Sequence, residues 1–256
     1  MRESLLLENG FEVVEADEPQ YLEELRKNIF IIAKQIFELP GSDPMEGLNN
    51  FHRSISNLTL GDLNKKRIEC IERITVECNA VEAIFKSFEQ RILGLLGPDI
   101  LAQKTCNLVI QPPGDPNPSE LHRDAPGNSP YELVVWVPLV NCFGTKTMYI
   151  LDITHSEKAL DRLAENPQDW DIFEQYVKSN AKRPNVAFGQ ALIFHAGCLH
   201  GSDINSERDT RVSLNVRYKN LFSPSGLKNQ LQFFKLLRAS HVTSLGSRFE
   251  ARDLQK

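Results

Sequence analysis

Two histidines and one aspartate carry the clearest chemical signal in this sequence. His122 and Asp124 stand two residues apart, and His200 follows far downstream. Residues two apart in an extended segment face the same side, so His122 and Asp124 can both point at one ion. Two imidazoles and one carboxylate can hold a redox-active iron on one face and leave the other coordination positions free. We therefore predict that these three residues bind Fe(II).

The third ligand must come from a distant segment, and five of the six histidines are left to supply it: His52, His155, His195, His200 and His241. His200 is favoured because residues 192–202 are typical of a strand that runs into a turn. The polar stretch 203–209 then resembles a hairpin loop leading into a strand at Arg211. Residues at comparable distances from such a turn become cross-strand neighbours, so we expect His200 beside Arg211. His195 is the rival ligand, and is otherwise a pocket or core residue.

The strand that begins at Arg211 points to a charged ligand through its alternation. Four polar side chains face one way, namely Arg211, Ser213, Asn215 and Arg217. Such a row can be an ordinary solvent-exposed face, or it can line the mouth of a barrel that holds a charged ligand. A lone His-x-Asp is often a surface salt bridge, and a lone strand histidine is usually core. Only the joint pattern favours the metal site and the second interpretation.

Composition argues against several classes of function. The 256 residues are 41% hydrophobic and 25% charged, as in an ordinary soluble globular protein. The net charge of −5 gives no general basic field for nucleic acid or an anionic membrane. No apolar run approaches the ~20 residues of a membrane helix, and the leucines after Ser4 are too few for a signal peptide. We expect a cytoplasmic protein without nucleic-acid or membrane partners.

The cysteines indicate a reducing compartment. They are scattered, odd in number and form no C-x-x-C pair, which argues against a zinc ribbon or a disulfide framework. We expect five buried, inert thiols, at Cys70, Cys78, Cys106, Cys142 and Cys198.

The elements that must position these residues fall into two parts. Residues 1–100 are mainly helical: an apolar stripe from Leu22 to Ile36 stops at Pro40, and a second helical region spans 62–96. Residues 41–60, rich in Gly, Pro, Asn and Ser, are predicted to be irregular.

From residue 104 the hydrophobic period changes to that of strands. The predicted strands are 106–110, 133–140, 147–153, 190–195 and 211–218. A charged insert at 156–182 is expected to form covering helices, and the tail 225–256 to return to helix, with Leu231, Phe234 and Leu237 buried. We predict one α+β domain over 1–256, with an antiparallel β-sandwich or barrel at 104–220.

The order of motifs resembles the phytanoyl-CoA dioxygenase-like superfamily of Fe(II)/2-oxoglutarate oxygenases. The matching segments are Asn9 to Val14, His122-x-Asp124, Trp136 to Leu139, Gly189 to His195, His200-Gly201-Ser202, Asn205, Arg211, Ser213 and Arg217-Tyr218. The resemblance implies a double-stranded β-helix (jelly-roll) core flanked by N-terminal and C-terminal helices.

A closer resemblance is to the oxygenases of carbohydrate biosynthesis clusters, in segments 122–132 and 217–224. The superfamily's usual Pro-Gly-Ser-His loop is missing, and residues 152–156 occupy its place. This departure leaves the substrate open. A sugar, a nucleotide-sugar or another small polar metabolite is expected, with a lipid-like acyl compound as the main alternative.

The resemblance also assigns roles to the site residues. It implies that 2-oxoglutarate binds the metal, that its distal carboxylate pairs with Arg211, and that Ser213 adds a hydrogen bond. The planar guanidinium suits bidentate pairing with a carboxylate better than lysine does. Together with O2 this would oxidise a substrate C–H bond and yield succinate and CO₂. The aspartate at 124 favours hydroxylation over halogenation, while desaturation or ring oxidation stays open.

Two other classes of function remain open. One is a jelly-roll metalloenzyme without redox chemistry, such as an epimerase or isomerase, whose ligands would be richer in histidine. The other is a non-catalytic carbohydrate-binding module, although Trp136 and Trp170 stand in apolar contexts. Further side chains that could face a substrate are Asn107, Gln111, Arg123, Trp136, Asn215 and Arg217. The sequence gives no oligomeric state.

Overall fold

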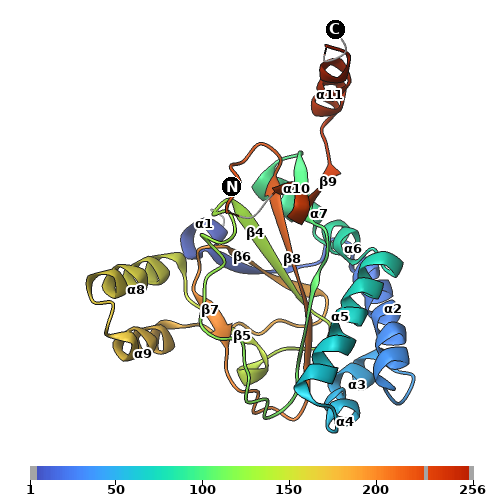
Figure 1. Cartoon of the computed structure of the whole chain (residues 1–256), viewed down its shortest axis with the longest axis vertical. Helices are drawn as coiled ribbons and strands as arrows, with labels where there is room; N and C mark the ends of the chain where they lie inside the picture. Colours follow the sequence, from blue (N-terminus) through green and yellow to red (C-terminus); the bar gives the residue numbers. More distant parts are fainter. Residues whose placement is uncertain (1–4, 228–229, 254–256) are drawn as a thin grey trace.

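Helices flank a central antiparallel sheet on both sides in the computed structural model, which describes residues 5–227 and 230–253 (Figure 1). Helices α2 to α6 lie on one side of the sheet, and the α8–α9 pair lies on the other side together with α1, while α11 projects away from the body. The helices before the core strands are α1 (Leu5–Asn9), α2 (Pro19–Phe37), α3 (Pro44–Asn49), α4 (His52–Ile55), α5 (Leu60–Glu77), α6 (Ala80–Ser87) and α7 (Glu89–Leu96). The later helices are η1 (Gly144–Lys146), α8 (Ile153–Glu165), α9 (Trp170–Asn180), α10 (Gln230–Phe233) and α11 (His241–Asp253).

The apolar stripe predicted for the first long helix is buried in α2. Its period of three and four residues places one side of the helix against the core. The buried members include Leu22, Leu25, Ile29, Ile32, Ala33 and Ile36. The helix ends where Glu38 adopts a left-handed conformation with φ 60°, two residues before Pro40. This prediction is confirmed.

The main sheet has seven strands, and β8 (Arg211–Asn220) is its longest. The strand order is β1-β6-β4-β8-β2-β9, and β3 also pairs with β8. The other strands of this sheet are β1 (Phe11–Glu15), β2 (Ile100–Gln103), β3 (Asn107–Gln111), β4 (Glu132–Pro138), β6 (Gln190–His195) and β9 (Phe234–Arg238). One edge of β8 pairs with β4, while its other edge is shared end to end by β3 and β2. All of these pairs are antiparallel.

A second sheet consists of β5 (Met148–Ile150) and β7 (His200–Ser202). Its two faces pack against different hydrophobic clusters, because alternate side chains of a strand point in opposite directions. Met148 and Ile150 belong to the main core, whereas Tyr149 joins a separate cluster with Phe173 and Val177 of α9. Because Ile150 pairs with His200, that imidazole lies on the face turned toward the main core. The mixed fold with antiparallel sheets is thereby confirmed, and the double-stranded β-helix stays a prediction.

Several element predictions differ from the structure. Residues 41–60 contain α3 and α4, whose Asp43 and Phe51 lie at the helix starts, and the helical region 62–96 is three helices. The mainly helical flank 1–100 contains strand β1, which completes the sheet by pairing with β6. The predicted helical tail was wrong at 234–238, where pairing with β2 overrides helix periodicity. Of the three residues predicted to be buried in the tail, Phe234 is buried, Leu237 is half-buried, and the side chain of Leu231 lies outside the described part of the structure. The insert forms helices α8 and α9, as expected, but α8 already begins at Ile153, so the predicted strand 147–153 is shortened to β5 at its C-terminal end.

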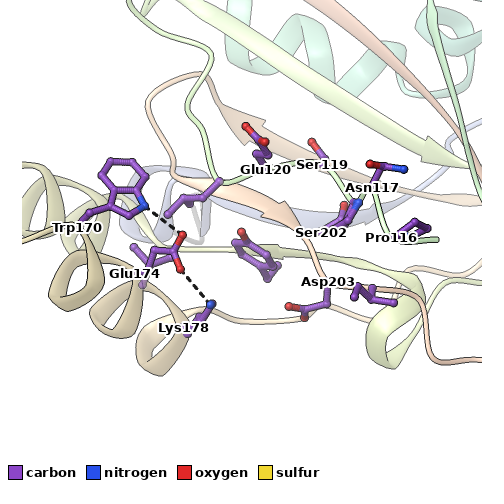
Figure 2. A pocket seen from close by; sticks show the side chains of 14 residues that line it. Pro116, Asn117, Ser119, Glu120, Trp170, Glu174, Lys178, Ser202 and Asp203 are labelled. Carbon is purple, nitrogen blue, oxygen red and sulfur yellow. Dashed lines mark hydrogen bonds and ion pairs between the residues drawn. The ribbon is translucent and has the colours of Figure 1, made fainter. Parts of the chain in front are cut away.

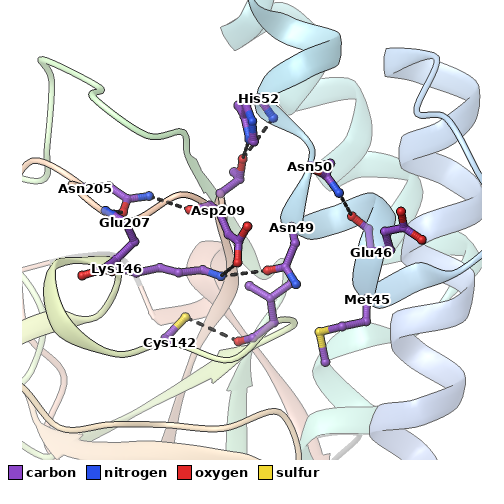
Figure 3. Close-up of polar contacts among 12 residues, drawn as sticks. Met45, Glu46, Asn49, Asn50, His52, Cys142, Lys146, Asn205, Glu207 and Asp209 are labelled. Carbon is purple, nitrogen blue, oxygen red and sulfur yellow. Dashed lines mark hydrogen bonds and ion pairs between the residues drawn. The ribbon is translucent and has the colours of Figure 1, made fainter.

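A buried lysine ties the N-terminal helices to the β core (Figure 3). Lys146 is 1% exposed, and its ammonium donates to Oδ1 of Asn49 at 2.8 Å. The carboxylate of Asp209 lies 4.0 Å away. Two further hydrogen bonds connect the same segments. The N–H of Thr210 donates to the carbonyl of Asn49, and Oγ1 of Thr210 accepts from the N–H of His52. These contacts together hold α3 against the segment that leads into β8.

All five thiols are free; four of them are buried and Cys78 is half-buried. Among the described residues, no helix combines the length and apolarity needed to cross a membrane.

Candidate metal centre

His122 and His200 belong to one short antiparallel ribbon. The N–H of His122 donates to the carbonyl of His200 at 3.0 Å, and the N–H of His200 donates back at 2.9 Å. The N–H of Ser202 donates to the carbonyl of Ser119, so the chain entering the His-x-Asp motif runs alongside β7. Directly paired residues point to the same face, and the two imidazole centroids lie 4.2 Å apart.

The two imidazoles are oriented in the same way. Nδ1 of His122 lies 2.8 Å from the carbonyl of Glu120, and Nδ1 of His200 lies 2.9 Å from the carbonyl of Cys198. A carbonyl only accepts, so each Nδ1 carries the proton and each Nε2 keeps a free lone pair. A hydrogen bond at one ring nitrogen that directs the other toward a metal is the usual arrangement of metal-binding histidines.

Asp124 completes the group. Ligand atoms of His122, Asp124 and His200 all lie within 4.8 Å of one another, an arrangement that could hold a metal ion. The backbone also anchors the aspartate, since the N–H of Ala125 donates to the carbonyl of Ala196 on the loop before β7. The structure therefore brings together all three residues that the sequence singled out.

The electrostatics favour the protonation states that bind metals. Burial lowers the pKa of His200 to about 4, and the neighbouring His122 adds to this shift. Burial alone would raise the pKa of Asp124, but the charge and hydrogen bonds of Arg217 outweigh it, so the pKa is lowered. Neutral imidazole and ionised carboxylate are the forms that coordinate a divalent ion.

Arg217 is the ion-pair partner of Asp124, a contact that the sequence did not predict. Its Nη2 lies 2.7 Å from Oδ1 of Asp124, and its Nε lies 3.3 Å from Oδ2. Nη1 reaches Oε1 of Gln103 on β2 at 3.4 Å. The alternation of β8 predicted the face on which Arg217 lies, but nothing in the spacing indicated Asp124 as its partner.

The polar row of β8 is turned inward. Arg211 is 3% exposed and Ser213 is fully buried, while Asn215 and Arg217 are half-buried. This excludes the ordinary solvent-exposed face for the first two residues. Oγ of Ser213 accepts a hydrogen bond from the Trp136 indole at 3.1 Å.

Arg211 is buried without a full set of partners. Its Nη1 donates to Oγ of Ser202 at 2.9 Å, two residues beyond His200 on β7. Within the described part of the chain, its Nε has no hydrogen-bond partner, and the same holds for the buried side-chain oxygens of Gln111 and Asn215. Burial lowers the pKa of Arg211 to about 10, which leaves it charged at neutral pH. A buried guanidinium with an unused donor needs an acceptor, which an anionic ligand would supply.

The predicted hairpin between His200 and Arg211 was wrong. β7 pairs with β5, and β8 pairs with β4, β3 and β2, so the two residues are not cross-strand neighbours. Residues 203–209 connect two different sheets, and it is the side chain of Arg211 that returns to β7.

The rival ligand His195 is used elsewhere. Its Nδ1 accepts a hydrogen bond from the N–H of Gly197, and its Nε2 donates to the carbonyl of Pro130 at 2.7 Å. Both ring nitrogens are therefore committed to the backbone, as expected for a structural histidine.

Two cavities adjoin the ribbon. The larger, of about 670 Å³, lies between α9 and residues 116–121 (Figure 2). Its lining includes Leu121 and Tyr149, whose side chains belong to the cluster on the outer face, away from His200. A second cavity of about 370 Å³ is lined by Arg211, Gln111 and Arg67. Of the two, the smaller one adjoins the buried guanidinium.

The chain has relatives in structure. No protein-family model and no curated protein matches it. One similar structure is the nickel complex of the non-heme monooxygenase ThoJ, with 19% identity, a TM-score of 0.54, and coverage of 93% of this chain and 84% of ThoJ. Apo ThoJ matches at 18% identity with a TM-score of 0.54, covering 92% of this chain and 82% of that one. The non-heme alpha ketoglutarate dependent carbocyclase SnoK, from nogalamycin biosynthesis, matches at 14% identity and a TM-score of 0.49, covering 92% and 96%. This chain therefore shares the overall fold of the non-heme monooxygenase ThoJ.

Proposed function

We propose that this protein is an Fe(II)- and 2-oxoglutarate-dependent dioxygenase. The observation that carries the proposal is the convergence of two Nδ1-anchored imidazoles and one carboxylate, together with a buried Arg211 that contacts Ser202, two residues beyond His200. Two histidines and one carboxylate suit Fe(II) and leave coordination positions open. The fold shared with ThoJ, a non-heme monooxygenase, supports this assignment.

The residues present fit both the metal and the co-substrate. His122, Asp124 and His200 would hold the iron through neutral imidazoles and an ionised carboxylate. The unpartnered Nε of Arg211 calls for an acceptor, and the distal carboxylate of 2-oxoglutarate would supply it. Ser213 lies on the same face of β8, two residues from Arg211, and would add a hydroxyl. When bound, iron and 2-oxoglutarate use O2 to hydroxylate a C–H bond, with 2-oxoglutarate converted to succinate and CO₂.

The chain's own residues would orient the reactants and exclude water from them. The carbonyls of Glu120 and Cys198 hold the two rings in position. Phe194 packs against the ring of His200 with centroids 4.8 Å apart, which excludes water from that side. Arg211, charged and buried, would bind the co-substrate with few competing waters.

We further propose a small polar metabolite, such as a sugar or nucleotide-sugar, as the substrate. The resemblance to oxygenases of carbohydrate biosynthesis clusters supports this choice, and the net charge of −5 argues against nucleic acid or an anionic membrane as the substrate. Hydroxylation is the proposed outcome because an aspartate occupies the carboxylate position at 124.

A ligand-binding experiment tests the metal and co-substrate together. Chelator-treated protein is titrated without oxygen with Fe(II) and 2-oxoglutarate, and a weak visible metal-to-ligand charge-transfer band is expected. Asp124→Ala should lose the band, whereas Asp161→Ala, at an exposed position on α8, should keep it. A folded wild-type protein without the band would favour an isomerase or a binding module. Succinate release stimulated by individual sugars or nucleotide-sugars then tests the substrate.

A further inference from the structure

Arg217 holds both oxygens of the proposed carboxylate ligand. Nη2 contacts Oδ1 of Asp124 at 2.7 Å, and Nε contacts Oδ2 at the longer distance of 3.3 Å. The pair is largely buried, with side-chain exposures of 13% for Arg217 and 7% for Asp124. A buried two-point ion pair of this kind fixes the orientation of a carboxylate as well as its position.

The arginine is itself held in place. It projects from β8 opposite Val134 of β4, and its third nitrogen reaches Gln103 on β2. Gln103 is 6% exposed. Arg217 therefore connects the main sheet to the loop of Asp124, while hydrogen bonds between His122 and His200 connect the same loop to the second sheet.

The two contacts differ in length, so the two oxygens of Asp124 differ in their availability to a metal. The short contact commits Oδ1 to Arg217, and the long contact leaves Oδ2 the more available oxygen. A carboxylate that gave both oxygens to the metal would occupy one coordination position more than a one-oxygen ligand. In the proposed enzyme, 2-oxoglutarate and O2 need the positions that the protein leaves open.

We propose that Arg217 is a positioning residue that keeps Asp124 a one-oxygen ligand, with Oδ1 on the guanidinium and Oδ2 on the metal. The inference rests on the proposed metal site and concerns how that site stays open to its co-substrate. Losing Arg217 frees Oδ1 for the metal, so metal binding is maintained or tightened while 2-oxoglutarate binding weakens. A merely structural ion pair behaves differently, since its loss weakens both together.

The test uses the full chain with cobalt(II) as the probe metal. Cobalt affinity, the visible cobalt spectrum and the affinity of the cobalt-loaded protein for 2-oxoglutarate are measured for wild type, Arg217→Met and Arg217→Lys. Lysine keeps the charge but cannot make the two-point contact. Both variants are expected to bind cobalt at least as tightly as wild type, to show an altered cobalt spectrum, and to bind 2-oxoglutarate at least tenfold more weakly.

A matched control is available on the surface of α5. Arg73 contacts Glu77 at two points, 2.6 and 3.1 Å, but the pair is more exposed, at 29% and 48%, and is remote in sequence from the ribbon. Arg73→Met and Arg73→Lys should leave all three measurements at wild-type values. If Arg217→Met fails to fold, Arg217→Lys alone decides the outcome.

Two results would overturn the inference while leaving the proposed function intact. One is a parallel loss of cobalt and 2-oxoglutarate binding in the Arg217 variants; the other is wild-type behaviour in both. A folded wild-type protein that binds no cobalt would instead overturn the metal site itself, and this inference with it.

Discussion

His122 and His200 exchange two backbone hydrogen bonds, of 3.0 and 2.9 Å, across a bridge that joins two distant parts of the chain. The spacing of the two histidine ligands is therefore set by the backbone, before any metal binds. Side chains that project from the same face of one ribbon need little rearrangement to meet an ion. Pre-organisation of this kind reduces the entropic cost of binding.

A methyl group at Gly201 would crowd this ribbon. A Cβ there would lie 2.6 Å from Cζ of Tyr149 and 3.1 Å from the backbone oxygen of Ser119. We expect Gly201→Ala to lower the free energy of unfolding by about 1–3 kcal/mol. We also expect it to weaken metal binding on the order of tenfold, because His200 is adjacent. Denaturant unfolding and cobalt titration measure the two effects.

Gly94 provides the control for this substitution. It lies in α7 with nothing within 4 Å of the added Cβ, so Gly94→Ala should not weaken metal binding. Combining Gly201→Ala with Tyr149→Ala removes the ring and should recover part of the lost metal affinity. Equal metal affinity in wild type and Gly201→Ala would show that the ribbon tolerates the shift.

Replacing Arg211 should weaken co-substrate binding but not metal binding. Arg211→Lys keeps a positive charge but loses the planar fork. Its affinity for 2-oxoglutarate is expected to fall about tenfold to a hundredfold, the equivalent of one or two charge-assisted hydrogen bonds. Calorimetric titration of the cobalt-loaded protein measures this, with the exposed Arg53→Lys as the control. An unchanged affinity would place the co-substrate elsewhere.

The burial of His200 predicts a pH dependence of stability. Its pKa is about 4 in the folded protein against an ordinary value of 6.5, so the unfolded chain takes up a proton first as the pH falls. Stability is thus lost as the pH falls below about 6.5, and the loss levels off near the folded pKa. By pH 5 the loss from this group is ~2 kcal/mol.

The measurement compares metal-free wild type with His200→Gln by urea unfolding at pH 7 and pH 5. The variant lacks the titrating imidazole, so its free energy of unfolding should decline by ~2 kcal/mol less than that of wild type between pH 7 and pH 5. Parallel declines in the two proteins would show that His200 is not buried in its neutral form.

Because Lys146 is buried, removing its hydrogen-bond acceptor should destabilise the protein more than removing the lysine itself. Asn49→Leu removes the side-chain oxygen that accepts a hydrogen bond from the Lys146 ammonium, and the carboxylate of Asp209 remains 4.0 Å away. We expect this to lower the free energy of unfolding by about 2–4 kcal/mol, since a buried charge is left poorly paired. Lys146→Met removes the charge itself and should cost less. Adding Lys146→Met to Asn49→Leu should therefore restore stability, as measured by denaturant unfolding; further destabilisation would contradict this.

The sequence determined which side chains could do chemistry and which strand faces they occupy. Alternation placed Arg211, Ser213, Asn215 and Arg217 on one face of β8, because side-chain direction in a strand follows from local geometry. It also determined α2, whose apolar stripe has to be buried. The edge strand β9 escaped prediction because pairing with β2 overrides the helical pattern of residues 225–256.

Only the tertiary structure decided which residues these side chains contact. His200 meets His122 through a bridge between distant segments, Arg211 returns to Ser202 from another sheet, and Arg217 reaches Asp124 from the middle of the main sheet. Each contact depends on strand order and on the packing of one sheet against another. These are non-local, whereas residue spacing reports only on neighbours along the chain.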